Sequence, residues 1–405
     1  MDALSPMGPC GWHLPCTLEC HAFSPSGRYL ALATGLPGAV NASRTVLVVD
    51  TENALVIDPF PQGERVTGLG WVSDEALVVL RAPSQPRPDG SPAATLVVLA
   101  VPDGGELAAW SAPPELATPV VLHCAPAAGV TMVSTQRWSP VGEGRGAVAL
   151  FQGAALEPVG RFCVDTELAV AGASRRALRC VLDPDGASVA VILGRWSRAR
   201  GTDRLGSVHV RAPSGDVKRV PAALQADSAE VAWVSPDALL VTAREEIWLA
   251  APGETAPAAR WSSPRGADRW TGALPSVSID REARLSFVCA PEEGRPTNGA
   301  TLRLLNLEER SLAEPTLGAE PLRGVARWCE GDRSFAVLRA PCDSRGTTLG
   351  LGRVGPRGLS LEQTYVLGGS MDRELLAVSP DGRWLLVQYH DWVSELIDVR
   401  RIREG

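Results

Sequence analysis

The sequence is poor in several residue types, and each shortage narrows its class. Only Lys218 is a lysine among 39 basic residues, and the chain has 3 tyrosines and 6 phenylalanines. Arginine, alanine, glycine and proline are abundant instead, which indicates a GC-rich and therefore bacterial genome. No apolar run reaches the roughly 18 residues of a membrane span. The start MDALSPMGPC lacks the basic and apolar segments of a signal peptide. We therefore expect a cytoplasmic protein without a membrane partner.

Motifs of catalysis and cofactor binding are also missing. The sequence contains no Gly-x-Ser-x-Gly elbow, no Gly-x-x-x-x-Gly-Lys-[Ser/Thr] loop, no His-Glu-x-x-His and no paired Cys-x-x-Cys. The formal net charge of −7 disfavours general binding of nucleic acid. We expect no enzymatic activity, no catalytic residue, no cofactor, no metal and no nucleic-acid partner.

A repeat of close to fifty residues is present along the whole chain. Its clearest copies are CHAFSPSGRYLALAT (20–34), LRCVLDPDGASVAVIL (178–193) and LLAVSPDGRWLLVQ (375–388), each an apolar run, a tight turn and a second apolar run. One residue stands just before the turn in each of eight units. These residues are Phe23, Trp71, Cys124, Leu182, Trp233, Ile279, Trp328 and Val378. The tryptophans in this column are expected to pack between neighbouring units.

Each unit continues with a third run of β-formers, such as TVLVVD (45–50), and most add a weaker fourth segment. The runs are short and bounded by turn residues, in line with the 40 glycines and 33 prolines, so we interpret them as strands. Four strands repeated every 40–50 residues are typical of a β-propeller. The sequence predicts an all-β, closed propeller of eight four-stranded antiparallel blades. Seven blades are the alternative, because units three and seven match the repeat least.

The turns FSPSGRYLALAT, LDPDGASVAVIL and VSPDGRWLLVQ resemble the SPDG turn of WD40-like propeller repeats, the kind seen in TolB-type propellers. Proline presets the first corner, Asp or Ser caps it, and glycine takes the corner that needs a positive φ. The Gly-His and Trp-Asp dipeptides of typical WD40 repeats are missing, so the resemblance assigns no subfamily. It implies a fold and no particular activity.

We predict one propeller domain over residues 1–405. Its N-terminal latch strand covers 1–17, and the blades cover 18–66, 67–117, 118–174, 175–226, 227–270, 271–321, 322–371 and 372–405. The last unit lacks a fourth strand. We therefore expect residues 10–16 to pair with the strand around Glu395–Val399 and to complete the last blade.

The N-terminal stretch CGWHLPCTLECH (10–21) offers five potential metal ligands: Cys10, His13, Cys16, Cys20 and His21. In a propeller, residues 10–16 would form an outer strand of the last blade and residues 18–23 an inner strand of the first. Outer and inner strands of four lie roughly 14 Å apart, whereas zinc holds its ligands at about 2.0–2.3 Å. We interpret this stretch as the seam between the chain ends, with cysteines that pack.

Two histidines, His21 and His123, fall in the first and therefore innermost runs of their units. The other seven units have small or apolar residues at the repeat position that His21 occupies. His21 is therefore either a hydrogen-bonded core histidine or a functional group that faces the central channel. His123 occupies the neighbouring column, so the two should face opposite sides of their strands. A shared site is therefore disfavoured.

The connections between second and third strands vary most, and in a propeller such loops carry the binding sites. The segment RWSRARGTDR places Arg195, Arg198, Arg200 and Arg204 within ten residues beside Trp196. Further arginines in equivalent loops are Arg87, Arg295 and Arg345. Arginine forks bind carboxylates and phosphates, and tryptophan anchors interfaces.

Three interpretations of the arginine-rich loop remain open: a solvated loop, a contact for an acidic protein segment, or a contact for nucleic acid. The absence of catalytic motifs favours a non-catalytic propeller that binds another protein as scaffold, adaptor, or sequestering or regulatory subunit of a bacterial complex. The alternative is a propeller enzyme, or a small-ligand or metal binder, that uses the channel.

Overall fold

The computed structural model describes most of the chain, with gaps. The described residues are 6–7, 11–14, 17–35, 45–53, 55–82, 94–113, 116, 120–135, 147–163, 175–197, 202–220, 229–243, 246–262, 276–280, 285–291, 300–312, 327–329, 334–339, 348–355, 358–367, 373–389 and 393–404.

Within the described residues, seven four-stranded antiparallel sheets follow one another, each with its strands in sequence order. The first two are β3 (Thr17–Phe23), β4 (Tyr29–Gly35), β5 (Thr45–Asp50), β6 (Leu55–Pro61) and β7 (Arg65–Ser73), β8 (Ala76–Ala82), β9 (Thr95–Ala100), β10 (Glu106–Ser111). The next two are β11 (Val120–Ala125), β12 (Val130–Thr135), β13 (Ala147–Gln152), β14 (Glu157–Cys163) and β15 (Arg175–Leu182), β16 (Val189–Ser197), β17 (Thr202–Arg211), β18 (Val217–Val220).

The remaining three of these sheets have the same order. They are β19 (Ala229–Ser235), β20 (Ala238–Ala243), β21 (Glu246–Ala250), β22 (Ala259–Ser262); β23 (Ser276–Asp280), β24 (Leu285–Pro291), β25 (Ala300–Asn306), β26 (Ser311–Leu312); and β27 (Arg327–Cys329), β28 (Ser334–Arg339), β29 (Thr348–Gly355), β30 (Gly358–Val366). A 3-10 turn, η1 (Pro126–Ala128), connects β11 to β12.

A further sheet, here called the end sheet, has five strands and joins both ends of the chain. Its order is β1 (Pro6–Met7), β2 (Gly11–Leu14), β33 (Val393–Asp398), β32 (Trp384–Tyr389), β31 (Arg373–Val378). The prediction of eight four-stranded blades is thereby corrected to seven four-stranded sheets. The reason is that the N-terminal segment contributes two strands to the end sheet, since β1 pairs along the outside of β2.

The predicted pairing of residues 10–16 with the last strand is confirmed for Gly11–Leu14, and residues 10, 15 and 16 lie outside the described residues. β2 runs antiparallel to β33, from Gly11 opposite Ile397 to Leu14 opposite Ser394. β33 then leads into a short helix, α2 (Val399–Glu404), which the sequence analysis did not foresee. Val399 and Ile402 of this helix are buried in a cluster shared by the end sheet and the β27–β30 sheet. The helix fills the space beside β33.

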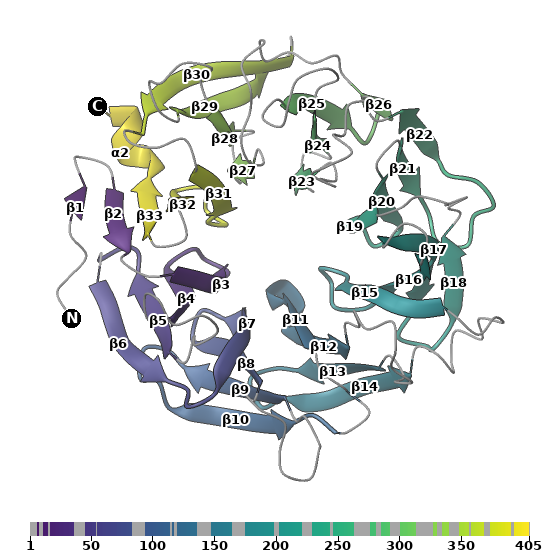
Figure 1. The fold of residues 1–405 in the computed structure, drawn as a ribbon, viewed down its shortest axis with the longest axis horizontal. Coiled ribbons are helices and arrows are strands. Elements are labelled where there is room, and N and C mark those ends of the chain that lie inside the picture. Colours follow the sequence, from purple (N-terminus) through teal and green to yellow (C-terminus); the bar gives the residue numbers. More distant parts are fainter. Residues whose placement is uncertain are drawn as a thin grey trace.

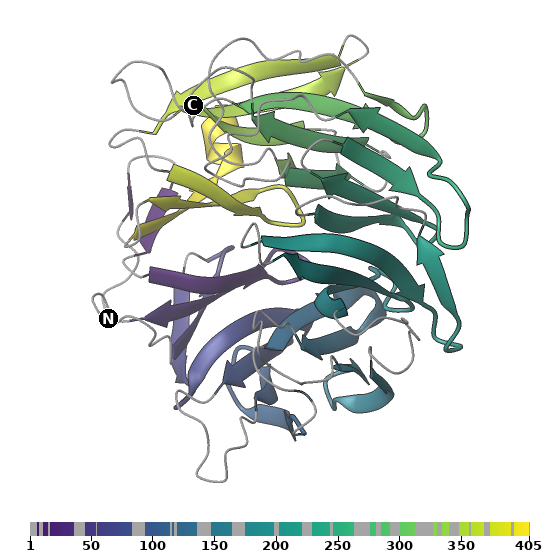
Figure 2. The same ribbon diagram turned by 45° about the vertical axis from the view of Figure 1, so that its right-hand side comes forward.

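The sheets are arranged around a central axis, with the first strand of each nearest the axis and the fourth at the periphery (Figure 1). Turned by 45°, the sheets are seen as successive layers packed face to face (Figure 2). Hydrophobic clusters fill the space between neighbours. One, including Ala31 and Val79, joins the β3–β6 and β7–β10 sheets, and another, including Leu32 and Leu386, joins the end sheet to the β3–β6 sheet.

Two tryptophans of the predicted column link adjacent innermost strands. Trp71 is 1% exposed and its indole Nε1 donates to the carbonyl of Ala22 at 3.0 Å. Trp233 is 2% exposed and donates to the carbonyl of Val181 at 3.1 Å. Each acceptor lies in the preceding sheet, one residue before the residue that precedes the turn there: Ala22 before Phe23, and Val181 before Leu182. The expected packing of these two residues between sheets is confirmed, with a repeated hydrogen bond as well.

The three SPDG-like turns share one hydrogen-bonded geometry. The backbone N–H of the first turn residue donates to the carbonyl five residues later, Ser24 to Tyr29 and Ser379 to Trp384 at 2.8 Å, and Asp183 to Ser188 at 2.9 Å. In two of them, the hydroxyl of that first residue also accepts the returning N–H. The turn glycines Gly27, Gly186 and Gly382 have φ of +80°, +66° and +69°, as the motif predicts.

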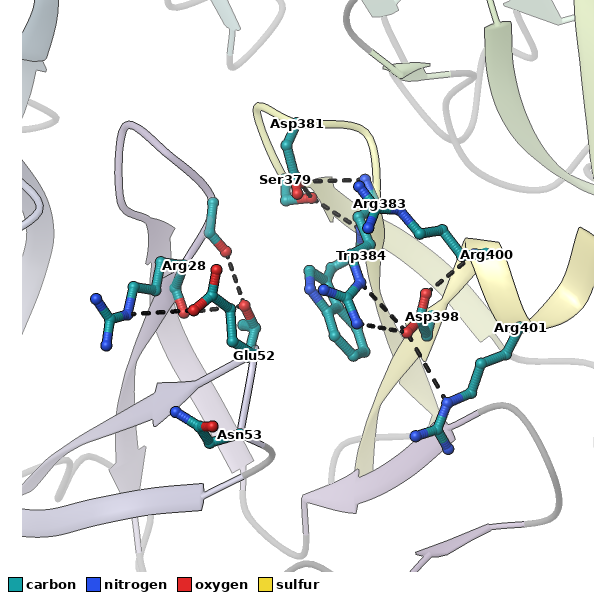
Figure 3. A network of polar contacts seen from close by, with 12 residues as sticks. Arg28, Glu52, Asn53, Ser379, Asp381, Arg383, Trp384, Asp398, Arg400 and Arg401 are labelled. Atoms are coloured by element: carbon teal, nitrogen blue, oxygen red, sulfur yellow. Dashed lines mark hydrogen bonds and ion pairs between the residues drawn. The ribbon is translucent and has the colours of Figure 1, made fainter.

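Two equivalent ion pairs stabilise the turns at the seam between the end sheet and the β3–β6 sheet (Figure 3). Arg28, which follows the turn glycine, lies 3.6 Å from Asp50 at the end of the third strand. In the same way, Arg383 follows its turn glycine and donates to Asp398 at 3.1 Å. The turns also meet, because a Cβ at Gly27 would lie 2.8 Å from Asp381 Oδ1.

Deleting residues 1–14 is expected to destabilise the protein. It removes the strand that pairs with β33 and leaves that edge exposed. A four-residue ladder with about four hydrogen bonds, at roughly 0.5–1.5 kcal/mol each, corresponds to about 2–6 kcal/mol. Thermal unfolding with light scattering measures the effect. The control is a deletion of residues 1–7 only, which removes β1, keeps β2 and should lower the stability much less. Equal melting temperatures of wild type and both deletion variants would contradict the stabilising role of the β2–β33 pairing.

Replacing Gly27 with alanine is expected to cost more stability than replacing Gly63. Both glycines have positive φ, +80° and +68°, so both substitutions carry the same backbone strain of about 1 kcal/mol. Only at Gly27 would the new Cβ meet Asp381, which adds roughly 1 kcal/mol. Denaturant unfolding of G27A, G63A and G27A/D381A measures the difference. Equal costs for the two single variants would show that the turns do not pack as described.

Candidate functional site

The predicted arginine-rich loop lies mainly on a long hairpin. β16 extends to Ser197 and β17 begins at Thr202, so Arg195, Trp196 and Arg204 occupy strand positions. The prediction that the segment RWSRARGTDR (195–204) forms a loop between the second and third strands was wrong for these positions. Two further predicted site residues in this segment, Arg198 and Arg200, lie outside the described residues, as do Arg87, Arg295 and Arg345.

Strand pairing continues into the hairpin because its residues form strands readily. Trp196 is opposite Asp203 and Ser197 is opposite Thr202, past a register shift at Gly194. Aromatic and β-branched residues such as Trp196 and Thr202 favour extended backbone. The two strands therefore reach nine and ten residues, with β16 ending at Ser197 and β17 beginning at Thr202.

Three arginines occupy directly opposed positions on three neighbouring strands. Arg175 of β15 is the partner of Arg195 on β16, and Arg195 is in turn the partner of Arg204 on β17. We call these three residues the arginine row. Asp203 is adjacent to Arg204 in the strand and is paired with Trp196, so it is not part of the arginine row. Sequence reasoning missed Arg175, because it lies twenty residues before Arg195 and only the register brings them together.

The sheet that carries the arginine row is basic, in contrast to the whole chain. Residues 175–219 contain ten arginines and lysines and four acidic residues, a formal charge of +6. Since the whole chain carries −7, the remainder carries −13. Lys218 and Arg219 on β18 contribute two of these charges and are exposed. Positive charge is therefore concentrated on one sheet.

The two candidate channel histidines do not come together. His21 on β3 is opposite Leu32, which belongs to the core between the end sheet and the β3–β6 sheet. His123 on β11 is opposite Met132, which belongs to the core between the β11–β14 and β15–β18 sheets. Directly opposed residues share a face, so each histidine borders a different intersheet core. Both are half-buried.

The potential ligands of the N-terminal stretch lie on two different sheets. His13 is on β2 of the end sheet, opposite Glu395, whereas Cys20 and His21 are on β3. Cys10 and Cys16 lie outside the described residues. Within the described ranges, no three His, Cys, Asp or Glu side chains gather into a group that could hold a metal. The seam interpretation agrees with the observed β2–β33 pairing.

Two cysteines on innermost strands are packing residues. Burial raises the pKa of the Cys124 thiol to about 12, although hydrogen bonds with Thr131 and with the backbone of Trp71 oppose this shift. Burial likewise raises the pKa of Cys180 to about 12, opposed by a hydrogen bond from Ser134. Cys124 also packs against Gly70 of the preceding sheet, where any Cβ would collide with its sulfur.

Comparison with known proteins identifies the fold. No protein-family model and no curated protein matches the sequence. The solved Dos1 propeller is similar over 96% of this chain and 94% of its own, with 12% identity and a TM-score of 0.60. The RRP9 WD40 repeats have 12% identity and a TM-score of 0.49, with 98% and 99% of the two chains covered. At these identities the likeness shows the fold alone.

The chain is thus an all-β propeller with four-stranded antiparallel blades, similar in fold to the solved Dos1 propeller. Among its described residues, no helix is long and apolar enough to cross a membrane.

Cys124 and Cys180 are expected to resist alkylation in the folded protein. With a pKa of about 12, each thiol is almost wholly protonated at pH 8, and the thiolate is the reactive form. Iodoacetamide labelling followed by peptide mass spectrometry checks this. Both peptides should be labelled only after unfolding in guanidinium; labelling of either at the rate of a free thiol would show that the site is open.

Proposed function

We propose that this propeller is a non-catalytic interaction protein that binds an acidic segment of a partner protein. It would serve as scaffold, adaptor, or sequestering or regulatory subunit of a complex. The observation that carries the proposal is the arginine row, Arg175, Arg195 and Arg204, on a sheet of charge +6 in a chain of charge −7.

Like charges at directly opposed positions destabilise a sheet pair, by roughly 0.2–1 kcal/mol. A row of three arginines therefore has a cost for folding that a bound anion would offset. Arginine presents a planar fork that pairs bidentately with carboxylates. Charge concentrated on one sheet also steers an oppositely charged partner toward it. An acidic protein segment has the chemistry that this surface accepts.

The alternative of an enzyme or ligand binder in the channel has less support. It needs functional groups that converge near the axis, and the two candidate histidines border different cores.

Several finer points belong to the proposal. Arg198 and Arg200 would extend the arginine row at the tip of the hairpin, and Arg87, Arg295 and Arg345 would widen the surface on equivalent loops. The whole of 1–405 would form one domain with the predicted blade boundaries, related to TolB-type propellers. The protein would be bacterial, as its arginine-rich composition indicates, and cytoplasmic.

Neutralising the arginine row is expected to abolish partner binding. The test is a pull-down from native lysate with wild type and with the R175Q/R195Q/R204Q variant, followed by cross-linking mass spectrometry to locate the bound segment. Wild type should retain a partner protein in stoichiometric amount, cross-linked through an acidic stretch. The variant should capture at least about tenfold less of this protein, as expected when charges that dominate the binding energy are lost.

The matched control is K218Q/R219Q, which removes exposed charges from β18 of the same sheet and should retain the partner. Circular dichroism verifies that all variants are folded. Equal capture by wild type and the row variant, or capture of nucleic acid in place of protein, would overturn the proposed function.

A further inference from the structure

The turns of the sheets form one face of the propeller. In an antiparallel sheet whose strands follow sequence order, the first-to-second and third-to-fourth connections lie at the same edge. Turns of neighbouring sheets meet there: the N–H of Ser26 donates to Asp74 at 3.0 Å, and a Cβ at Gly186 would lie 2.6 Å from Cγ2 of Val130. We call this side of the molecule the turn face.

The turn face is acidic. Among the described residues in these turns, at the strand ends beside them and in α2, twelve acidic side chains and four arginines are exposed. The acidic residues are Glu52, Glu75, Asp103, Glu106, Glu157, Asp185, Asp216, Asp237, Glu254, Glu308, Glu309 and Asp381, and the arginines are Arg28, Arg310, Arg400 and Arg401. This excess of negative charge repels nucleic acid and anionic lipid and favours a basic partner.

Exposed apolar side chains gather at the outer rim of the same face. Leu55 and Val56 begin β6, Leu107 is the second residue of β10, and Val159 is the third residue of β14. Their exposed fractions are 58%, 36%, 53% and 56%, and the three strands follow one another along the periphery (Figure 1). Single exposed apolar residues are ordinary, but four large ones at one edge of three neighbouring sheets indicate a contact area. We call these four residues the apolar rim.

Two residues of the apolar rim occupy the same irregularity in two neighbouring sheets. Leu107 is the extra residue of a bulge between β9 and β10, and Val159 is the extra residue of a bulge between β13 and β14. Both bulges fall beside the next-to-last residue of the third strand, which is Leu99 in one sheet and Phe151 in the other. A bulge re-aims the side chain that it carries. The fold thus exposes a large apolar residue at the same place twice.

We propose that the apolar rim, together with the acidic turns beside it, binds a basic amphipathic segment of a partner protein. The apolar side of this segment would cover Leu107 and Val159. Its arginines and lysines would pair with the nearby carboxylates, such as Glu106, which adjoins Leu107, and Glu157, two residues before Val159.

Charge also decides against other occupants of the rim. A second copy of this chain is a poor one, because two turn faces would bring like charges together. The rim lies at the opposite edge of the sheets from the arginine row, and binding there is independent of the proposed acidic partner.

The probe is a synthetic amphipathic peptide of leucine and lysine, with its lysines on one helical face, and its binding is measured by fluorescence anisotropy. Wild type should bind it more tightly than a scrambled peptide of the same composition, and should not bind a version with glutamate in place of lysine. L107S/V159S should weaken binding at least about tenfold, because exposed apolar anchors carry most of the energy of such contacts. E106Q/E157Q should weaken it at least about fivefold at low salt and less at high salt.

Two variants are matched controls. V366S removes an apolar side chain that is 66% exposed at the far end of β30, away from the turn face. E254Q/E308Q removes the same charge as E106Q/E157Q from the turn face, but on the fifth and sixth sheets. Both should bind the peptide as wild type does, and circular dichroism verifies that all variants are folded.

Carbodiimide coupling locates the bound peptide independently. The reagent joins a carboxylate to a lysine amine, and the protein has only one lysine, Lys218, so couplings to carboxylates come chiefly from the peptide. Mass spectrometry of the digested complex should find the peptide on Asp103, Glu106 or Glu157.

Several results would overturn the proposed rim contact. They are equal binding by wild type and L107S/V159S, equal binding of the ordered and scrambled peptides, and no binding of the lysine peptide at all. An equal loss of binding in the control variants would show a diffuse effect of charge in place of a local contact. Couplings confined to the other sheets would likewise contradict it.

Discussion

Burial of both faces of each sheet is the constraint on which this structure depends. The central strands are nearly continuous apolar runs, and residues such as Val78 and Val79 are both fully buried although they face opposite sides. A single sheet of this kind cannot be stable alone, because one or both faces would be exposed to water. Each sheet therefore needs a neighbour on either side, and radial arrangement around an axis provides one.

The same constraint determines where function can lie. The innermost strands are used for contact between sheets, with tryptophan hydrogen bonds from Trp71 and Trp233 and close packing at Gly70. A half-buried histidine there is part of a core. Away from these contacts, β16 and β17 extend to nine and ten residues and carry Arg195 and Arg204 of the arginine row.

Much of the fold could be predicted because the repeat encodes it locally. The turn residues from Ser24 to Tyr29 specify their hydrogen bonds by themselves, and the tryptophan column follows from spacing alone. Strand β1 of the end sheet and helix α2 could not be predicted, because each is decided by tertiary contacts of short segments without a pattern. The arginine row was missed for a related reason, since opposition of Arg175 and Arg195 depends on a register shift between Ala177 and Arg179.

The pairing of β2 with β33 also constrains the order of assembly. About 380 residues separate the two strands, and contacts at such sequence distance form late. At roughly 5–20 residues per second, β2 emerges from the ribosome many seconds before its partner exists. The end sheet can therefore assemble only after synthesis of the last strand. Until then the nascent chain carries an unpaired N-terminal strand, which gives chaperones a defined interval in which to act on it.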